Sequence, residues 1–470
     1  MTADSYEGKE MTRDEKQNKL MTETSIPKLV IRLSIPTTVS MLVTAIYNMA
    51  DTYFVSQLGT SASGAVGIVF SLMSLIQAVG FTLGMGAGSL ISRKLGEKDK
   101  KSADAYSASA FYAALLIGAV ISLFGNLFIE SLMKILGATD TILPFAIDYG
   151  KYIIWGAPIM CASFVLNNTL RSEGKSALSM IGLSLGGILN IVLDPILIFT
   201  FDLGTAGAAI ATFISQFISF LVLLSMFIFK KSITSLSIKN ISLKPKIYLD
   251  ILEMGLPSFC RQALASGASV LLNRSAAIYG DPAVAAMSIV GKVAMFVLSA
   301  TLGIGQGFTP VAGYNYGAKK FPRIREAFKF TLITSTIAMT LLGVFVFVFS
   351  EDIMMLFRAS DIEVISIGVL AMRCQCIAMP LQTFVVLTNM IHQGLGRAKE
   401  ATFLSVCRQG IFFIPLILIL PKLLGLTGVQ ISQGIADFLT FFSSIPFAII
   451  FFKKLKQEEN EYKETNKTAD

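Results

Sequence analysis

Residues 33–58, LSIPTTVSMLVTAIYNMADTYFVSQL, form an apolar stretch that carries a single charge, Asp51. About 20 residues of helix cross the hydrocarbon core of a bilayer, so this stretch predicts a membrane-spanning helix. A carboxylate inside such a helix costs about 2.5–3.5 kcal/mol on insertion scales, and it usually faces a cavity or a partner on an ion or proton path. Because Asp51 lies past the middle of the stretch, the alternative is a place among the headgroups at the helix end.

The composition of the whole chain also indicates a membrane protein. Of the 470 residues, 53% are hydrophobic and 15% are charged, whereas soluble domains carry about 25% charged residues. The apolar runs are long and uninterrupted, which favours helices over the alternating strands of a barrel. The twelve predicted spans are residues 29–56, 64–91, 105–129, 147–170, 178–200, 206–229, 251–278, 283–313, 327–349, 364–392, 401–421 and 429–452.

Lys and Arg residues are distributed unevenly over the predicted loops. The loops on one side of the membrane hold 18 of them, and the loops on the other side hold 3. The basic loops are 92–104, 171–177, 230–250, 314–326 and 393–400. The positive-inside rule predicts that these basic loops and both termini lie in the cytoplasm. The net charge of +8 is then a matter of topology, and nothing points to nucleic acid. No cleavable signal peptide is expected, because the first apolar run leads straight into a full span.

The two halves of the chain repeat one another at a shift of 221 residues. Pro36 aligns with Pro257, and Gly84-Met85-Gly86 aligns with Gly305-Gln306-Gly307. The sequence therefore predicts an all-α polytopic membrane protein with twelve transmembrane helices in two pseudo-symmetric six-helix bundles. Its parts are a cytoplasmic N-terminal segment that is disordered or lies on the surface (1–28), an N-terminal lobe (29–229), a cytoplasmic linker (230–250), a C-terminal lobe (251–452) and a disordered cytoplasmic tail (453–470).

An even number of spans in each half starts both halves on the same side of the membrane. The halves are then parallel repeats about an axis along the membrane normal, which suits a transporter whose bundles rock around a cleft. The alternative is that duplication built a larger bundle and nothing more.

Polar residues recur on the fifth and sixth spans. Asn190 and Asp194 are four residues apart and share one face of a helix, and Pro195 follows directly. Proline removes its own N–H and displaces the carbonyl four residues back, which exposes extra oxygen ligands. Thr212 and Gln216 lie one turn apart on the next span. The alternative reading is that these residues serve helix–helix packing.

The second half has a different electrical character. Asp437 is the acid clearly inside its spans, whose basic residues are Arg261, Arg274, Lys292, Arg373 and Arg408. These cations either pair with an acid or snorkel toward the membrane surface, or they line a cleft and contact anionic groups. His392 is the only histidine and the five cysteines all fall in apolar helices, so no metal cluster, catalytic triad or enzyme is indicated.

Three motifs carry a resemblance to a known family. They are NMADT at 48–52 with Gly59, LNIVLDP at 189–195 and GIGQGFTPVAGYNYGAK at 303–319. The chain resembles a bacterial member of the multidrug and toxic compound extrusion (MATE) family over residues 25–452. The resemblance implies twelve helices in two lobes, and a cleft that opens alternately to each side of the cytoplasmic membrane. It also implies antiport of small organic cations and drugs against H⁺ or Na⁺, with no cofactor, and an expected monomer that confers antibiotic resistance.

The resemblance also implies site residues. The ion-coupling site, including any Na⁺ ligands, would be Asp51, Asn190, Asp194 and Thr212, and candidate residues of the substrate cleft within the motifs are Asn48, Gln306, Tyr314 and Asn315. Part of the family has a glutamate in the seventh helix and an aspartate in the tenth. This chain lacks both, since these helices read GLPSFCRQALASG and AMPLQTFVVLTNMIHQ.

Two carboxylates close together in a poorly solvated lobe cannot both stay ionised at low cost. We therefore expect the site to take up a proton or a sodium ion from outside, to bend the first helix near Pro36 and to release the drug. Two rival readings on the same fold are a lipid-linked oligosaccharide flippase and an exporter of an anionic metabolite, both of which the basic second half would suit.

Overall fold

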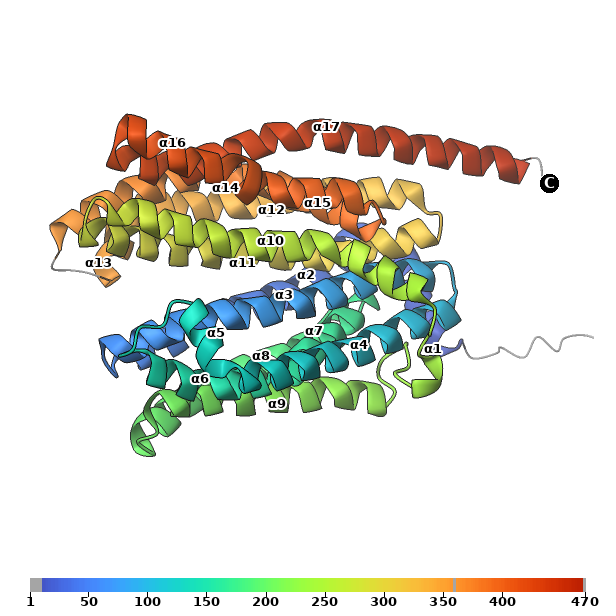
Figure 1. Cartoon of the computed structure of the whole chain (residues 1–470). Coiled ribbons are helices and arrows are strands. Elements are labelled where there is room, and N and C mark those ends of the chain that lie inside the picture. Colours follow the sequence, from blue (N-terminus) through green and yellow to red (C-terminus); the bar gives the residue numbers. More distant parts are fainter. Residues whose placement is uncertain (1–10, 358–360, 468–470) are drawn as a thin grey trace, which may run out of the picture.

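The computed structural model describes residues 11–357 and 361–467, and within these ranges the regular structure is helical. The helices form two layers, one from each half of the chain, which lie side by side along their length (Figure 1). Both layers run roughly parallel to one axis, with α1 (Arg13–Glu23) at one end. We call this the α1 end and the opposite one the far end.

The N-terminal bundle contains six spans. They are α2 (Ile26–Ser56), α3 (Thr60–Gly96), α4 (Lys100–Leu127), the pair α6 (Leu143–Trp155) and α7 (Ala157–Ser172), α8 (Ser176–Pro195) with the π-helix η1 (Ile196–Thr200), and α9 (Gly204–Ile228). The short helix α5 (Ile129–Ile135) connects α4 to α6 at the far end. Helices α6 and α7 meet at an angle of 48° and together cross the bundle as one broken span.

The C-terminal bundle repeats this order. Its spans are α10 (Pro245–Ala277), α11 (Asp281–Gly317), α12 (Phe321–Val348), α14 (Ile362–Gly394), the run of α15 (Ala398–Val406), the π-helix η3 (Cys407–Phe413) and α16 (Ile414–Leu424), and α17 (Leu426–Lys467). The short helix α13 (Ser350–Phe357) follows α12 as α5 follows α4. Among the described residues, ten helices are long and apolar enough to span a membrane, and the broken pair is an eleventh span. Helix α10, which has 33 residues but more charges, completes twelve.

The repeat is visible in the backbone as well as in the sequence. Gly59 and Gly280 have φ values of 111° and 93° and precede α3 and α11, which are equivalent helices. Lys98 and Lys319 follow those helices, and both have a positive φ, 61° and 59°, which is uncommon for residues with a side chain. The two bundles therefore share turn conformations as well as helix order.

Two segments at the α1 end are more ordered than the sequence predicts. Within the segment 1–28, expected to be disordered or to lie on the surface, residues 13–23 form α1, whose Met21 is buried. The tail from residue 453 was expected to be disordered, yet α17 continues to Lys467. Ion pairs hold the end of α17 in place, since Glu459 pairs with Arg325 at 2.6 Å and Glu458 pairs with Arg397 at 3.0 Å. The linker is also shorter than predicted, because α10 begins at Pro245.

The bundles make their closest contacts toward the α1 end. A Cβ on Gly86 of α3 would lie 2.0 Å from the Ile251 carbonyl oxygen of α10, and one on Gly303 of α11 would lie 2.4 Å from Thr38 Cα of α2. Such close approach between helix backbones requires small residues. In contrast, Cβ atoms on Gly67, Gly267 and Gly291, in the far half, would meet nothing within 4 Å.

The hydrophobic cores follow the same division. One core joins the N-terminal bundle to the α1-end halves of the C-terminal helices, through residues such as Phe308, Ile391 and Phe451. The buried members of the second core belong to the C-terminal bundle, most of them to its far half, and the partly buried Leu42 of α2 packs against them. The two bundles are therefore fused at the α1 end and have separate cores toward the far end.

Candidate functional site: a polar cluster inside the N-terminal bundle

A polar cluster lies inside the N-terminal bundle, toward the far end. The Asn190 side chain of α8 donates from Nδ2 to Oδ1 of Asp194 at 3.2 Å and to Oγ1 of Thr212 in α9 at 3.2 Å. The spacing of four residues places Asn190 and Asp194 on one face of α8, as predicted. Asn190, Asp194 and Thr212 are each at most 4% exposed. The structure therefore brings three of the four predicted coupling residues into one hydrogen-bonded group.

Asp51 reaches the same cluster through a residue that the sequence analysis missed. The Tyr149 hydroxyl of α6 donates to Oδ2 of Asp51 at 3.2 Å. Tyr149 also interacts with the Thr212 side chain and lies close enough to Asp194 for electrostatic coupling. It is 3% exposed. A hydroxyl near the start of the predicted span 147–170 was the available signal, but only packing shows that it faces α2 and α9.

The cluster contains more oxygen atoms than hydrogen-bond donors. Among the described residues, the buried atoms Asp51 Oδ1, Asn190 Oδ1 and Asp194 Oδ2 have no hydrogen-bond partner. The two carboxylates interact electrostatically with one another. Neither forms an ion pair with a basic residue in the part of the chain that the structure describes. Unpaired buried oxygens of this kind suit a hard cation, which prefers oxygen ligands, or a proton that one carboxylate holds.

The helix changes type just after Asp194. The α-helical hydrogen-bonding pattern of α8 ends at Pro195, and the wider π-helix η1 follows directly. Proline lacks a backbone N–H, and π-turns within helices are frequent at functional sites. The predicted disturbance at Pro195 thus takes the form of a change of helix type beside the carboxylate.

The candidate residues of the substrate cleft are not brought together. Asn48 lies on α2, one turn before Thr52, whose hydroxyl donates to its carbonyl at 2.9 Å. Gln306 is 2% exposed and accepts a hydrogen bond from Arg171 of α7. Asn315 donates to the Met21 carbonyl at 3.2 Å, at the α1 end.

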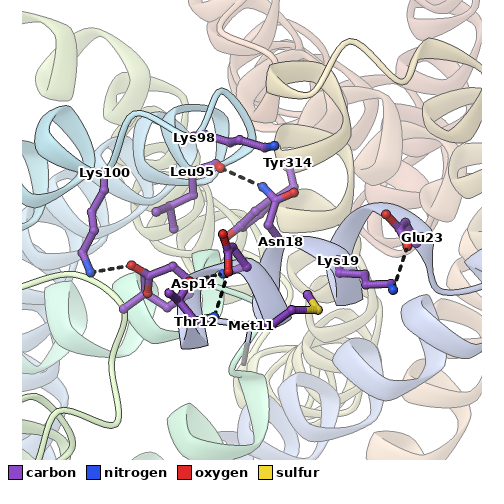
Figure 2. Close-up of a pocket in the computed structure, with 12 residues that line it drawn as sticks. Met11, Thr12, Asp14, Asn18, Lys19, Glu23, Leu95, Lys98, Lys100 and Tyr314 are labelled. Carbon is purple, nitrogen blue, oxygen red and sulfur yellow. Dashed lines mark hydrogen bonds and ion pairs between the residues drawn. The ribbon is translucent and has the colours of Figure 1, made fainter. Parts of the chain in front are cut away.

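Tyr314 and α1 occupy the α1 end. A pocket of about 720 Å³ lies there between α1, α3 and α11, and Tyr314 lines it together with charged residues of α1 (Figure 2). Figure 2 shows the pairing of Asp14 with Lys100 and the contact of Asn18 with the Leu95 carbonyl, which hold α1 to the N-terminal bundle. The predicted polar cluster is therefore separate from this pocket.

The C-terminal bundle has a different polar centre. Asp437 of α17 accepts from Arg408 Nε at 2.7 Å, from Gln382 at 2.5 Å and from Gln433 at 3.1 Å. The suggestion that Asp437 pairs with an arginine is thus met by Arg408. Arg373 donates to Ser350 at 2.9 Å and stacks on the Phe347 ring.

Comparisons with known proteins agree with the fold. The MatE family model matches residues 36–196 and 257–419, and the chain therefore belongs to the MATE family of transporters. The multidrug export protein MepA of Staphylococcus saprophyticus is 28% identical over 416 residues, covering 88% of this chain and 92% of that protein.

Solved structures extend the likeness to three dimensions. A MATE structure in complex with MaL6 has a TM-score of 0.90 and 28% identity, and the match covers 95% of this chain and 100% of that one. An outward-facing multidrug resistance MATE transporter of the MOP superfamily has a TM-score of 0.89 and 28% identity, with 96% of this chain and 100% of that one covered. The predicted all-α class with twelve spans in two bundles is confirmed.

Proposed function

We propose that this chain is a secondary active multidrug exporter of a bacterial cytoplasmic membrane, which exchanges cationic, amphipathic organic compounds for H⁺ or Na⁺ by alternating access. The observation that carries the proposal is the polar cluster of Asp51, Asn190, Asp194 and Thr212, which has two carboxylates and no basic partner among the described residues. The names of the relatives support the cargo class, since MepA is a multidrug export protein. The expected exporter works as a monomer.

The two bundles act as the moving lobes, residues 29–229 and 251–452. The excess of Lys and Arg in the loops at the α1 end supports a cytoplasmic position for that end and for both termini. In this proposal, the contacts concentrated at this end close the path to the cytoplasm, and the division into two cores suits lobes that part toward the outside. We infer that the conformation is outward-open.

The coupling step follows from the chemistry of the cluster. In the outward-open state, one proton or sodium ion enters the cluster and is held by Asp51 and Asp194, with the amide oxygen of Asn190 as a neutral ligand. One bound cation cancels one of the two negative charges, which removes the repulsion between the carboxylates and lets α2, α8 and α9 pack more closely, and this displaces the cargo. A coupling ion shifts the equilibrium between conformations only by its differential affinity for them. Opening to the cytoplasm rehydrates the cluster, and the ion leaves.

The remaining cleft candidates take different places in this scheme. Asn48 lies on α2 three residues before Asp51 and is a candidate for contact with cargo. Gln306 is proposed to contact cargo only after the lobes separate at the α1 end, because Arg171 now occupies it. Tyr314 and Asn315 instead help to close the α1 end, where Asn315 holds the backbone of α1.

Efflux from proteoliposomes tests the proposal. A fluorescent organic cation is loaded, and a pH gradient and a sodium gradient are imposed separately. We expect Asp51→Asn and Asp194→Asn to reduce gradient-driven efflux to the background. Asp202→Asn is the matched control, because it removes the same charge from the exposed loop after η1, where φ is 53° and Asn is well tolerated. Undiminished efflux in both cluster variants would remove the cluster from the mechanism.

A further inference from the structure

A polar cavity lies inside the C-terminal bundle, and the proposed efflux scheme does not use it. It has a volume of about 120 Å³ and lies between α10, α11, α14, α15 and η3. Its polar lining consists of Arg261, Gln262, Asn389, Ser405, Arg408 and Gln409. Leu298, Val385 and other aliphatic residues form the remaining wall. We call this space the C-terminal cavity.

The cavity carries one positive charge that nothing on its walls cancels. Arg408 is neutralised by Asp437, at 2.7 Å from Nε to Oδ1. Arg261, in the middle of α10, has no hydrogen bond, ion pair or ring contact in the part of the chain that the structure describes. The acceptors left over on the lining are the amide oxygens of Asn389 and Gln409, which are buried and also lack partners. These oxygens are neutral, so they can orient a guanidinium but cannot balance its charge.

An unbalanced guanidinium inside a membrane protein requires an explanation. A basic residue at the bilayer centre costs several kcal/mol and is found facing a cavity, an acid or a ligand path. The planar fork of arginine matches a carboxylate with two parallel hydrogen bonds, which lysine cannot make. The volume of about 120 Å³ is too small for a whole drug-sized molecule, whose pockets measure about 300–1,000 Å³. It is large enough for the end group of such a molecule.

We propose that the C-terminal cavity binds the carboxylate group of an amphoteric cargo, with Arg261 as its charged contact. The inference rests on the proposed export function and narrows the cargo class to compounds that carry a carboxylate besides their cationic or aromatic body. Gln262 and Ser405 line the same cavity and supply neutral donors. The acidic cluster of the N-terminal bundle then handles the coupling ion, and the basic cavity of the C-terminal bundle selects cargo.

Equilibrium binding of a matched pair of dyes tests this proposal. The probes are a rhodamine with a free carboxylate and its methyl ester, which share the same fluorophore and differ in that one charge. Binding to the purified full-length protein is followed by fluorescence anisotropy. Because a hydrogen-bonded charge pair contributes about a tenfold or larger factor, we expect the wild-type protein to bind the carboxylate dye at least about tenfold more tightly than the ester.

Two variants of α10 test whether the preference for the carboxylate dye over its ester depends on Arg261. Arg261→Gln is expected to abolish the preference for the carboxylate while leaving ester binding within about twofold. Arg274→Gln is the control, because Arg274 lies on the same helix and is exposed outside the cavity, so the preference should persist. Equal binding of the two dyes by the wild type, or an unchanged preference in Arg261→Gln, would overturn the proposal.

A measurement on the unmodified protein covers the case in which Arg261→Gln fails to fold. Benzoate is expected to compete with the carboxylate dye and not with the ester, and competition with neither dye would refute the carboxylate site. The result is independent of the export proposal, because gradient-driven efflux of the ester is measured separately. Efflux of the ester without any carboxylate preference would leave the exporter in place and remove the cavity from cargo recognition.

Discussion

The Tyr149 hydroxyl and the Asp51 carboxylate are joined at 3.2 Å across the interface of α6 and α2. This hydrogen bond connects the carboxylate on the first span to the group of Asn190, Asp194 and Thr212 on the fifth and sixth. Asp51 is less buried than Asp194. The hydrogen bond from Tyr149 therefore holds the Asp51 side chain in the cluster, whereas without it this side chain could turn toward solvent.

Replacement of Tyr149 should therefore weaken coupling without changing charge. A hydrogen bond to an ionised group contributes about 1.5–3 kcal/mol, so Tyr149→Phe is expected to lower gradient-driven efflux roughly tenfold. Tyr152→Phe is the control, because Tyr152 lies on the same helix and packs against Trp155 away from the cluster. Efflux is measured in proteoliposomes under the same gradient. Equal rates for Tyr149→Phe and wild type would mean that the hydrogen bond has no role in coupling.

Arg171 of α7 and Gln306 of α11 form a polar bridge between the bundles. Arg171 is 4% exposed and also contacts Asn168, so Gln306→Leu leaves part of a buried guanidinium without an acceptor. The cost, about 1–3 kcal/mol, falls on the conformation described here. We expect about a tenfold shift toward a conformation that is open at the α1 end.

Distances between two equivalent turns report this shift. Spin labels at Lys98→Cys and Lys319→Cys lie on exposed positions of the two bundles. Gln306→Leu should add a population with a longer distance, whereas Gln306→Glu keeps an acceptor for Arg171 and should not. The same distance distribution in both variants would show that the bridge does not stabilise the closed α1 end.

Helix α1 connects the two bundles across the α1 end. Asp14 pairs with Lys100 of the N-terminal bundle at 2.6 Å, and the carbonyls of Thr22 and Thr24 accept from Lys320 and Arg323 of the C-terminal bundle at 3.1 and 2.6 Å. Deletion of residues 1–24 is expected to remove this connection and to increase the long-distance population of the same label pair. Deletion of residues 1–10 alone is the control and should leave the distribution unchanged. An identical effect of both deletions would contradict the assignment to α1.

A pH effect is expected at the start of α4. The Asp99 side chain accepts a hydrogen bond from the Ser102 N–H at 3.0 Å, and hydrogen bonds from Ser102 hold the pKa of Asp99 below its usual value. A lowered folded-state pKa gives a stabilisation that is present above the unfolded value, about 3.9, and is lost as pH falls through the folded one. The protection of the first turn of α4 against hydrogen exchange, relative to the intrinsic rate at each pH, should therefore fall below about pH 4.

The C-terminal repeat supplies the control for this effect. Lys320 takes the equivalent place before α12 and makes no side-chain cap. The first turn of α12 should therefore keep its protection against hydrogen exchange over the same pH range. A parallel loss of protection in both helices would point to general unfolding in acid.

The sequence predicts the fold well because its signals are local. Long apolar runs mark the spans, and glycine and proline at repeated positions mark the equivalent turns, such as Gly59 and Gly280. The ordered segments α1 and the end of α17 escape prediction because long-range partners hold them, as Arg325 holds Glu459. Composition alone does not reveal those partners.

The residues of the candidate site also differ in whether a local sequence signal reveals them. Asn190 and Asp194 are found from helical spacing, and Thr212 from the resemblance. Tyr149 is missed because its role depends on how α6 packs. Tyr314 and Asn315 share a distinctive motif with Gln306, yet a motif does not say at which depth of the bundle each residue acts.

The close approach at Gly86 and Gly303 has a consequence for how the protein moves. At these glycines the main chains of the two bundles meet with no side chain between them, so the bundles can separate without a change of side-chain rotamer. This contact between the bundles is held by many weak dispersion interactions, which are lost gradually as the bundles tilt apart. A bulkier residue at either glycine would keep the two bundles apart, and the transporter could no longer close at the α1 end.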